Sequence, residues 1–315
     1  MNKMKLNSFD DILKHYILMP DTFWPEDTVF HRRNREKLVK ARAVVKEFDD
    51  DSLQVRLKED LEKRYEEKHK TLYVISCGSS GCHFLGEMLS LIGNFDLIKE
   101  VYYPPELMRL CREGELSEKE RMMLFDLVSY FPSRGIKKKQ PDIVPINIMH
   151  LRSDTPTRYV KEMGGHHLIL LMRNPFDIAY SRTFRKDDYR AEADPNASDM
   201  DYLKKQISNV KRFYRLALQE RNVFDDIVRY EDLVRDPYSS LHDLLFVAKE
   251  KFPEAWKSKS RITKVNQLVG NNGSINFNSK KKKVLDRQVS RLLKEELDVL
   301  CSDLGFSLPD YIDSY

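Results

Sequence analysis

The segment Leu72-Tyr-Val-Ile-Ser-Cys-Gly-Ser-Ser-Gly81 carries the first signal of the fold. Residues 72–76 form a short apolar run with β-branched members, which is typical of a buried parallel strand. A glycine-bearing turn follows. Apolar residues then recur at helical spacing from Phe84 to Ile92, where Gly93 can close a helix. A strand, a turn and a helix in immediate succession predict the start of an α/β unit.

Three segments further along the chain have the same strand character. They are 143–149, which ends at His150, then 167–172, which ends at Arg173, and finally 227–230. Stretches long enough for crossover helices, such as 199–220, lie between them. This alternation predicts a P-loop-like, three-layer α/β fold with a mainly parallel central sheet flanked by helices.

The N-terminal part of the chain has a different texture. Residues 1–30 are interpreted as a loose helix followed by an extended loop. The charge-dense segment 31–70 is interpreted as one or two surface helices with a solvated face. We expect residues 1–70 to form a helical flank or lid of the same domain as the α/β remainder, 71–315.

The composition restricts the class of protein. The chain has 315 residues, 41% of them hydrophobic and 33% charged, with a net charge of +4. No segment combines dense basic residues with stacking aromatics, so nucleic-acid binding is not predicted. No apolar run is long enough for a membrane span, and the N-terminus does not resemble a signal peptide, so we expect a cytoplasmic protein. A homodimer is left open.

The cysteines do not predict a metal site. Cys77, Cys82, Cys111 and Cys301 are irregularly spaced and are expected to be free thiols. Cys77, Cys82 and His83 are too widely spaced for a zinc knuckle, and no second ligand pair follows them.

Ligands of open parallel sheets bind beyond the carboxyl ends of the strands. The predicted strands end at the Gly78–Gly81 turn, His150, Arg173 and Tyr230. The turn would aim backbone N–H groups and the positive end of a helix at one point, which favours an anion. It is not a Walker A loop, because the Gly-Lys-Ser/Thr ending is absent. Taken alone, it fits an ordinary tight turn equally well.

The segment Arg173-Asn-Pro-Phe-Asp-Ile-Ala-Tyr-Ser181 closely resembles the 3'-phosphate-binding segment of sulfotransferases of the cytosolic type. These enzymes use 3'-phosphoadenosine 5'-phosphosulfate (PAPS) as sulfonyl donor. An arginine offers a planar fork to a phosphate, and a serine adds a hydroxyl donor. The resemblance therefore implies that Arg173 and Ser181 bind the 3'-phosphate.

Further positions follow from this resemblance, which covers roughly residues 71–306. The family's 5'-phosphosulfate loop corresponds to Ser79, Ser80, Gly81, Cys82, His83 and Phe84. Phe84 would replace the aromatic that stacks on adenine, and Tyr230, in Tyr-Glu-Asp-Leu, would also approach the adenine. His150 occupies the place of the catalytic base. The implied reaction moves a sulfonyl group from PAPS to a hydroxyl or amine of a small-molecule acceptor and leaves PAP.

Two departures from the family pattern affect the chemistry. Lysines that normally neutralise the leaving phosphate are Ser79 and Ile148 here. His83, Arg152 and the run 137–139 are the candidates to compensate, so His83 and Arg152 are added to His150 as catalytic candidates. The lysines of 280–283 are either a phosphate clamp or a solvated run.

Two alternative functions stay open. One is a degenerate, binding-only relative, and the other is a nucleotide-dependent kinase of similar fold. The segments around 95–140 and 185–200 are expected to line the acceptor pocket.

Overall fold

The computed structural model describes most of the chain, with gaps. The described residues are 6, 8–24, 26, 28–44, 49–68, 70–113, 116–134, 144–150, 157–162, 166–184, 190, 194–237, 239–242, 244, 250, 252–253, 286–309 and 312.

Five parallel strands form one sheet in the order β2-β3-β1-β4-β5. The strands are β1 (Leu72–Ser76), β2 (Phe95–Val101), β3 (Val144–His150), β4 (His167–Met172) and β5 (Asp226–Arg229). The predicted α/β class with a parallel central sheet is confirmed. The expected strands at 72–76 and 167–172 are confirmed as well, and β3 and β5 differ from expectation by one residue at each end.

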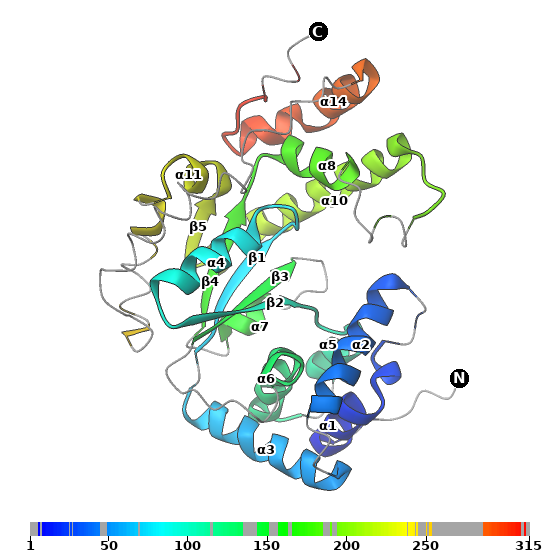
Figure 1. Cartoon of the computed structure of the whole chain (residues 1–315), viewed down its shortest axis with the longest axis vertical. Helices are drawn as coiled ribbons and strands as arrows, with labels where there is room; N and C mark the ends of the chain where they lie inside the picture. The colour runs from blue at the N-terminus through cyan, green and yellow to red at the C-terminus, as the bar shows by residue number, and fades with distance from the viewer. Residues whose placement is uncertain are drawn as a thin grey trace.

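Helices cover both faces of the sheet (Figure 1). Alternating side chains of β1 point to opposite faces, as the pleat of a strand requires. Leu72 and Val74 pack toward helices α4 and α11, whereas Tyr73 and Ile75 pack toward α8, α10 and α14. These helices are α4 (Cys82–Ile92), α8 (Pro175–Phe184), α10 (Asp199–Gln219), α11 (Tyr230–Arg235) and α14 (Arg287–Asp303). None of the helices in the described segments is both long and apolar enough to cross a bilayer.

The N-terminal helices contribute to the core. They are α1 (Phe9–Leu18), the short 3₁₀ helix η1 (Pro20–Thr22), α2 (Val29–Val44) and α3 (Asp50–Glu66). The segment 31–70, interpreted as one or two surface helices with a solvated face, holds most of α2 and the whole of α3, and the opposite face of each helix is packed, because Leu38, Leu53 and Leu57 are at most 2% exposed. They pack beside α5 (Pro105–Glu113) and α6 (Glu118–Arg134) (Figure 1). That residues 1–70 act as a lid stays a prediction.

Strand β2 lies at the start of the segment 95–140, which we expected to line the acceptor pocket and for which we predicted no strand. It is an edge strand that pairs with β3 alone, and an edge position tolerates charges such as Asp96 and Glu100 that a central strand would exclude. The register with β3 shifts between Leu97 and Lys99, as in a β-bulge. Phe95 therefore packs toward α4, and Val101 packs toward the opposite layer. The shift turns Glu100 to the α4 side of the sheet.

The amino ends of β1 and β4 are joined by a histidine that must stay neutral. His166 Nδ1 accepts a hydrogen bond of 3.1 Å from the Thr71 backbone N–H, which requires an unprotonated nitrogen. Burial lowers the pKa of His166 to about 4. Between pH 6.5 and 4 the unfolded chain then binds more protons than the folded one, so stability falls as the pH falls through this window.

We expect His166→Asn to lose less stability than the wild type between pH 6.5 and 4. The asparagine oxygen still accepts from Thr71, and it does not take up a proton in this range. The difference should be about 1–3 kcal/mol, because one pKa unit corresponds to about 1.4 kcal/mol. Urea unfolding of both proteins at several pH values measures it. If the free energies of unfolding of both proteins fall equally as the pH falls, His166 does not couple folding to proton binding.

Candidate active site

The turn after β1 has an unusual backbone. Gly78, Ser79 and Gly81 have φ angles of +72°, +53° and +89°, in the left-handed region. This conformation carries the chain from β1 into α4 within five residues. Gly81 caps α4 without a side-chain hydrogen bond, so the N–H groups of the first helical turn are not capped by that residue. Such a helix end attracts anions.

Tyr230 packs directly on this turn. A Cβ atom at Gly81 would lie 2.3 Å from two ring carbons of Tyr230, closer than any side chain allows. The Arg173 guanidinium lies over the same ring, 4.6 Å from its centroid, and the Phe84 ring contacts it edge-on at 6.4 Å. The ends of β4 and β5 and the start of α4 therefore meet at the turn.

Two arginines bracket the turn. Arg173 Nη1 donates to the Ser79 carbonyl at 2.7 Å, and Arg182 Nη1 donates to the Cys77 carbonyl at 2.5 Å. A Cβ atom at Gly78 would lie 3.5 Å from Arg182 Nη1 and 3.3 Å from His150 Cε1. Sequence reasoning missed Arg182. Its position directly after Ser181 on α8 was the available signal.

Asn174, in the segment Arg173–Ser181, has a structural function. Its Oδ1 accepts from the Phe176 N–H at 3.0 Å and caps α8, with Pro175 at the first helical position. Its backbone N–H donates to Glu231, and its Nδ2 donates to the Ser307 carbonyl, both at 2.8 Å. The motif thus fixes the position of Arg173 relative to α11 and the C-terminal segment.

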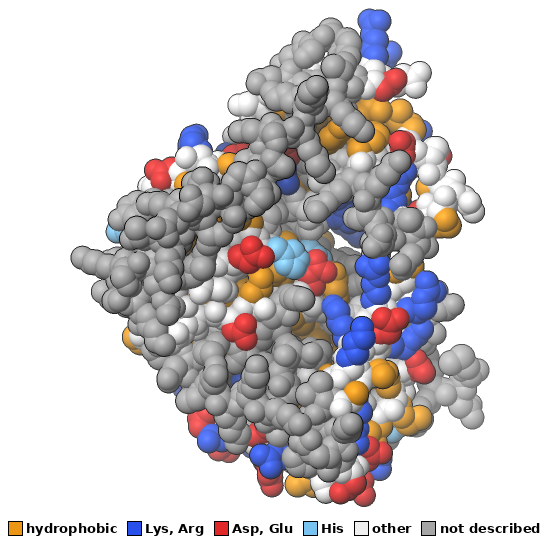
Figure 2. All heavy atoms as spheres, in the orientation of Figure 1, with side chains coloured by type: hydrophobic (Ala, Val, Ile, Leu, Met, Phe, Trp, Pro, Cys, Tyr) orange, Lys and Arg blue, Asp and Glu red, His pale blue; other side chains and the backbone are white. Residues whose placement is uncertain are grey.

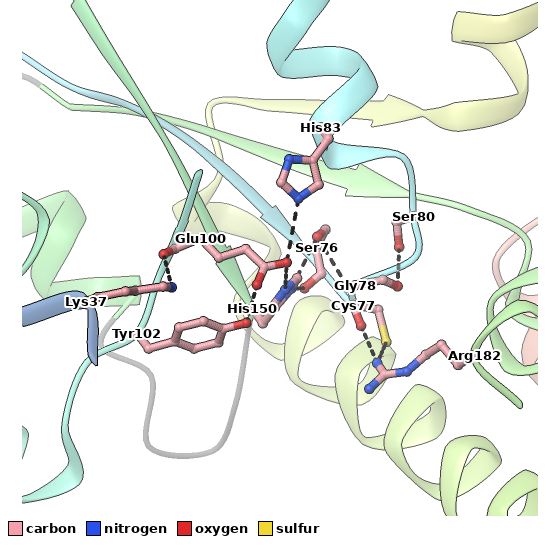
Figure 3. A network of polar contacts seen from close by, with 10 residues as sticks. All are labelled: Lys37, Ser76, Cys77, Gly78, Ser80, His83, Glu100, Tyr102, His150 and Arg182. Carbon is pink, nitrogen blue, oxygen red and sulfur yellow. Dashed lines mark hydrogen bonds and ion pairs between the residues drawn. The ribbon is translucent and has the colours of Figure 1, made fainter. Parts of the chain in front are cut away.

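A histidine–carboxylate pair lies beside the turn. Histidine side chains flanked by acidic ones are visible near the centre of the face in Figure 2, and Figure 3 shows the contacts. His150 Nε2 is 3.2 Å from Glu100 Oε1. His150 Nδ1 is 3.2 Å from the Ser76 carbonyl and 3.5 Å from its hydroxyl. Glu100 thus orients the His150 imidazole through Nε2, and Nδ1 of the same ring lies toward the turn.

Glu100 is held in its ionised form. Burial raises the pKa of its carboxyl, but hydrogen bonds from His150, His83 and Tyr102 outweigh this effect and hold the pKa well below its usual range. His83 Nε2 is 3.7 Å from Glu100 Oε1, and its side chain is 52% exposed. Sequence reasoning missed Glu100, because its position depends on the edge strand and its bulge.

The remaining predicted residues of the first loop lie as follows. Ser80 and Cys82 are buried, so only their backbone groups can reach a ligand at the turn. The Ser80 hydroxyl donates to the Gly78 carbonyl at 3.4 Å. Ile148, where the family has a lysine, is fully buried between the sheet and α4, where a charge would be costly.

The structure does not bring all of the other residues predicted from the sequence to the turn. Ser181 is half-buried on α8, and its hydroxyl makes no hydrogen bond to another described residue. Arg152 and the runs 137–139 and 280–283 lie outside the described residues. Cys77, Cys82 and Cys301 are free and buried, as expected for them. No group of three or more metal-ligating side chains occurs within the described ranges.

Comparisons with known proteins were made on the sequence and on the fold. No family model and no curated protein matches the chain. Similar solved structures include mouse sulfotransferase SULT7A1 complexed with PAP, at 15% identity over 80% of this chain and 96% of that chain, with a TM-score of 0.43.

Two further structures are similar at comparable levels. Retinol dehydratase in complex with androsterone and inactive cofactor PAP has 15% identity over 76% of this chain and 83% of its own, with a TM-score of 0.45. The sulfotransferase domain from the curacin biosynthetic pathway has 13% identity over 76% and 99%, with a TM-score of 0.33. Two of the three are named as sulfotransferases, the family that the sequence resembles. Sequence identities and TM-scores at this level do not assign an activity to the chain.

The close approach of Tyr230 to the turn predicts the effect of a methyl group there. Gly81→Ala should destabilise the protein by roughly 2–4 kcal/mol, because it combines a left-handed backbone with a clash against the ring. In a Tyr230→Ala background the same change should cost less, since the clash is gone and only the backbone strain remains. Denaturant unfolding of the four proteins measures both effects. An equal cost in both backgrounds would contradict the contact.

Proposed function

We propose that the protein is a sulfotransferase that uses PAPS as donor and a hydroxyl- or amine-bearing small molecule as acceptor. The observation that carries the proposal is the turn bracketed by Arg173 and Arg182, which lies against the His150–Glu100 pair. An anion-binding turn next to a base suits group transfer to an acceptor whose proton must leave.

The residues around the turn fit the donor. The uncapped start of α4 and the two arginines suit its phosphate and sulfonyl oxygens. The Nε of Arg173 is buried and has no partner among the described residues, which leaves a donor for a ligand. Tyr230 and Phe84 offer aromatic surface for an adenine. When bound, PAPS supplies the sulfonyl group, and PAP is the product.

The His150–Glu100 pair supplies the base. The two groups are within hydrogen-bond distance, with His150 Nε2 3.2 Å from Glu100 Oε1. The pair takes the proton of the acceptor hydroxyl or amine, and the ionised carboxylate stabilises the imidazolium that results. His83, half-exposed and 3.7 Å from Glu100, is the contact that an incoming acceptor displaces most easily.

Arg173 and Arg182 can supply the positive charge that the family obtains from two lysines, at the positions of Ser79 and Ile148 here. Arg182 lies at the turn from the α8 side, and Arg173 from the end of β4. Positive charge therefore reaches the turn from elements other than those that carry the family lysines. This favours an active enzyme over a binding-only relative. A kinase is disfavoured because the turn lacks the Gly-Lys-Ser/Thr ending with which P-loop kinases hold the nucleotide phosphates and magnesium.

The first test concerns the donor. Arg173→Ala and Arg182→Ala should each weaken PAP binding by about 10–100-fold, the loss expected for one charge-assisted contact to a phosphate. Isothermal titration calorimetry measures the dissociation constants. Arg235→Ala is the matched control, since Arg235 is exposed on α11 and pairs with Asp232.

The wild type should bind PAP more tightly than ATP, because a 3'-phosphate is what Arg173 and Ser181 are expected to recognise. Equal affinity for PAP in the wild type, Arg173→Ala and Arg182→Ala would rule out this donor site. Preferential binding of ATP would favour the kinase alternative.

The second test separates binding from chemistry. His150→Ala and Glu100→Gln should each lower sulfonyl transfer by about 10²–10⁴, the usual contribution of a general base, with PAP affinity nearly unchanged. Single-turnover assays with PAPS measure the rate, and calorimetry measures the affinity. His166→Asn is the matched control, because His166 lies at the amino end of β4, whereas the proposed site lies at the carboxyl ends of the strands. A variant of the pair with wild-type turnover would place the base elsewhere.

A further inference from the structure

Helix α2 reaches the catalytic pair. Lys37 Nζ is 3.4 Å from the Glu100 carbonyl oxygen and lies 5.1 Å from the centroid of the Tyr102 ring. The Tyr102 ring also lies beside His150, at a centroid distance of 6.0 Å. One aromatic ring therefore separates a cation of α2 from the proposed base (Figure 3).

Two more cations of α2 share the side of the helix that carries Lys37. Arg33 precedes Lys37 by four residues and Lys40 follows by three, so their directions differ from that of Lys37 by only about 40° and 60°. Both are exposed, whereas Lys37 lies half-buried at the edge of the packed face that contains Leu38 and Ala41. The three cations, here called the α2 stripe, extend about 10 Å along the helix axis.

Helix α2 carries far more positive than negative charge. The helix has six Lys or Arg and one acidic residue, Glu36. Figure 2 shows Lys and Arg side chains gathered over α2, beside the histidine and acidic group at the centre of the face. The overall net charge is only +4, so this concentration is local. Cations next to a catalytic site raise the local concentration of anionic substrates.

We propose that the acceptor is anionic, with two or more carboxylate or sulfate groups that bind to the α2 stripe of Arg33, Lys37 and Lys40. This inference rests on the sulfotransferase function proposed above and names its substrate class. The reactive hydroxyl lies at the His150–Glu100 pair, and the anionic groups lie roughly one to two helical turns, about 5–11 Å, away from it. Glu100 adds one negative charge nearby, but His150 and Tyr102 already hydrogen-bond its carboxylate.

A matched pair of phenols tests the charge requirement. The dianion 5-hydroxyisophthalate and its neutral diamide have nearly the same shape, so their affinities differ mainly through charge. PAP-loaded wild type should bind the dianion at least tenfold more tightly than the diamide. Lys37→Gln and Lys40→Gln should each weaken the dianion about 3–10-fold and leave the diamide unchanged. The disulfonate analogue of the dianion shows whether sulfate or carboxylate is preferred.

Arg42→Gln is the control for these variants. Arg42 is on the same helix but on another side, where it pairs with Asp50 at 2.7 Å, so its loss should leave dianion binding unchanged. Equal binding of dianion and diamide, or equal losses in Arg42→Gln and the stripe variants, would overturn the inference.

Failure of the proposed function has a separate signature. If the wild type does not bind PAP, the donor assignment fails. The dianion titrations on the free protein then still report on the α2 stripe, with the same expected differences between variants. If PAP binds but the stripe variants match the wild type, only the anionic-acceptor inference fails.

Discussion

The left-handed turn between β1 and α4 is the constraint on which the rest of the site depends. A strand can pass into a helix within five residues only if several backbone angles enter a region that side chains disfavour. The absence of a Cβ atom at Gly81 admits the Tyr230 ring, and the same turn leaves the start of α4 uncapped. The carbonyls that face outward from this turn are the ones that Arg173 and Arg182 bind. Any change in the turn would therefore move the anion site and both arginines together.

A second irregularity, the bulge in β2, brings Glu100 to His150. Without the register shift, Glu100 would face the layer of α8 and α10, because side chains alternate along a strand. With the shift it faces His150 and His83 on the α4 side. The pair is thus built from two adjacent strands, one central and one at the edge, and backbone pairing fixes both partners. This arrangement fixes the imidazole more firmly than a loop residue could.

Positive charge reaches the site from elements around the turn rather than from the turn itself. Ser79 and Ile148 carry no charge, and Ile148 is buried where a charge would be costly. Arg182 comes from α8, and Lys37 comes from α2, 39 residues before β1 ends at Ser76. In the proposed reaction, the cations at the turn bind the donor phosphates, and those on α2 bind the acceptor. In a partly buried site such charges are screened less than on an open surface.

The sequence by itself determined most of the sheet and which residues stand at the ends of its strands. Buried parallel strands are continuous apolar runs, so β1, β3, β4 and β5 could be recognised one at a time. His150, Arg173 and Tyr230 could be placed because strand ends meet at one edge of such a sheet. Only the tertiary structure decided the positions of Glu100, Arg182 and Lys37. Glu100 depends on a bulge in a charged edge strand, and the other two depend on which side of a helix packs against the sheet. Local patterns encode burial and turn geometry, whereas contacts between distant polar side chains form only when register and helix packing are set.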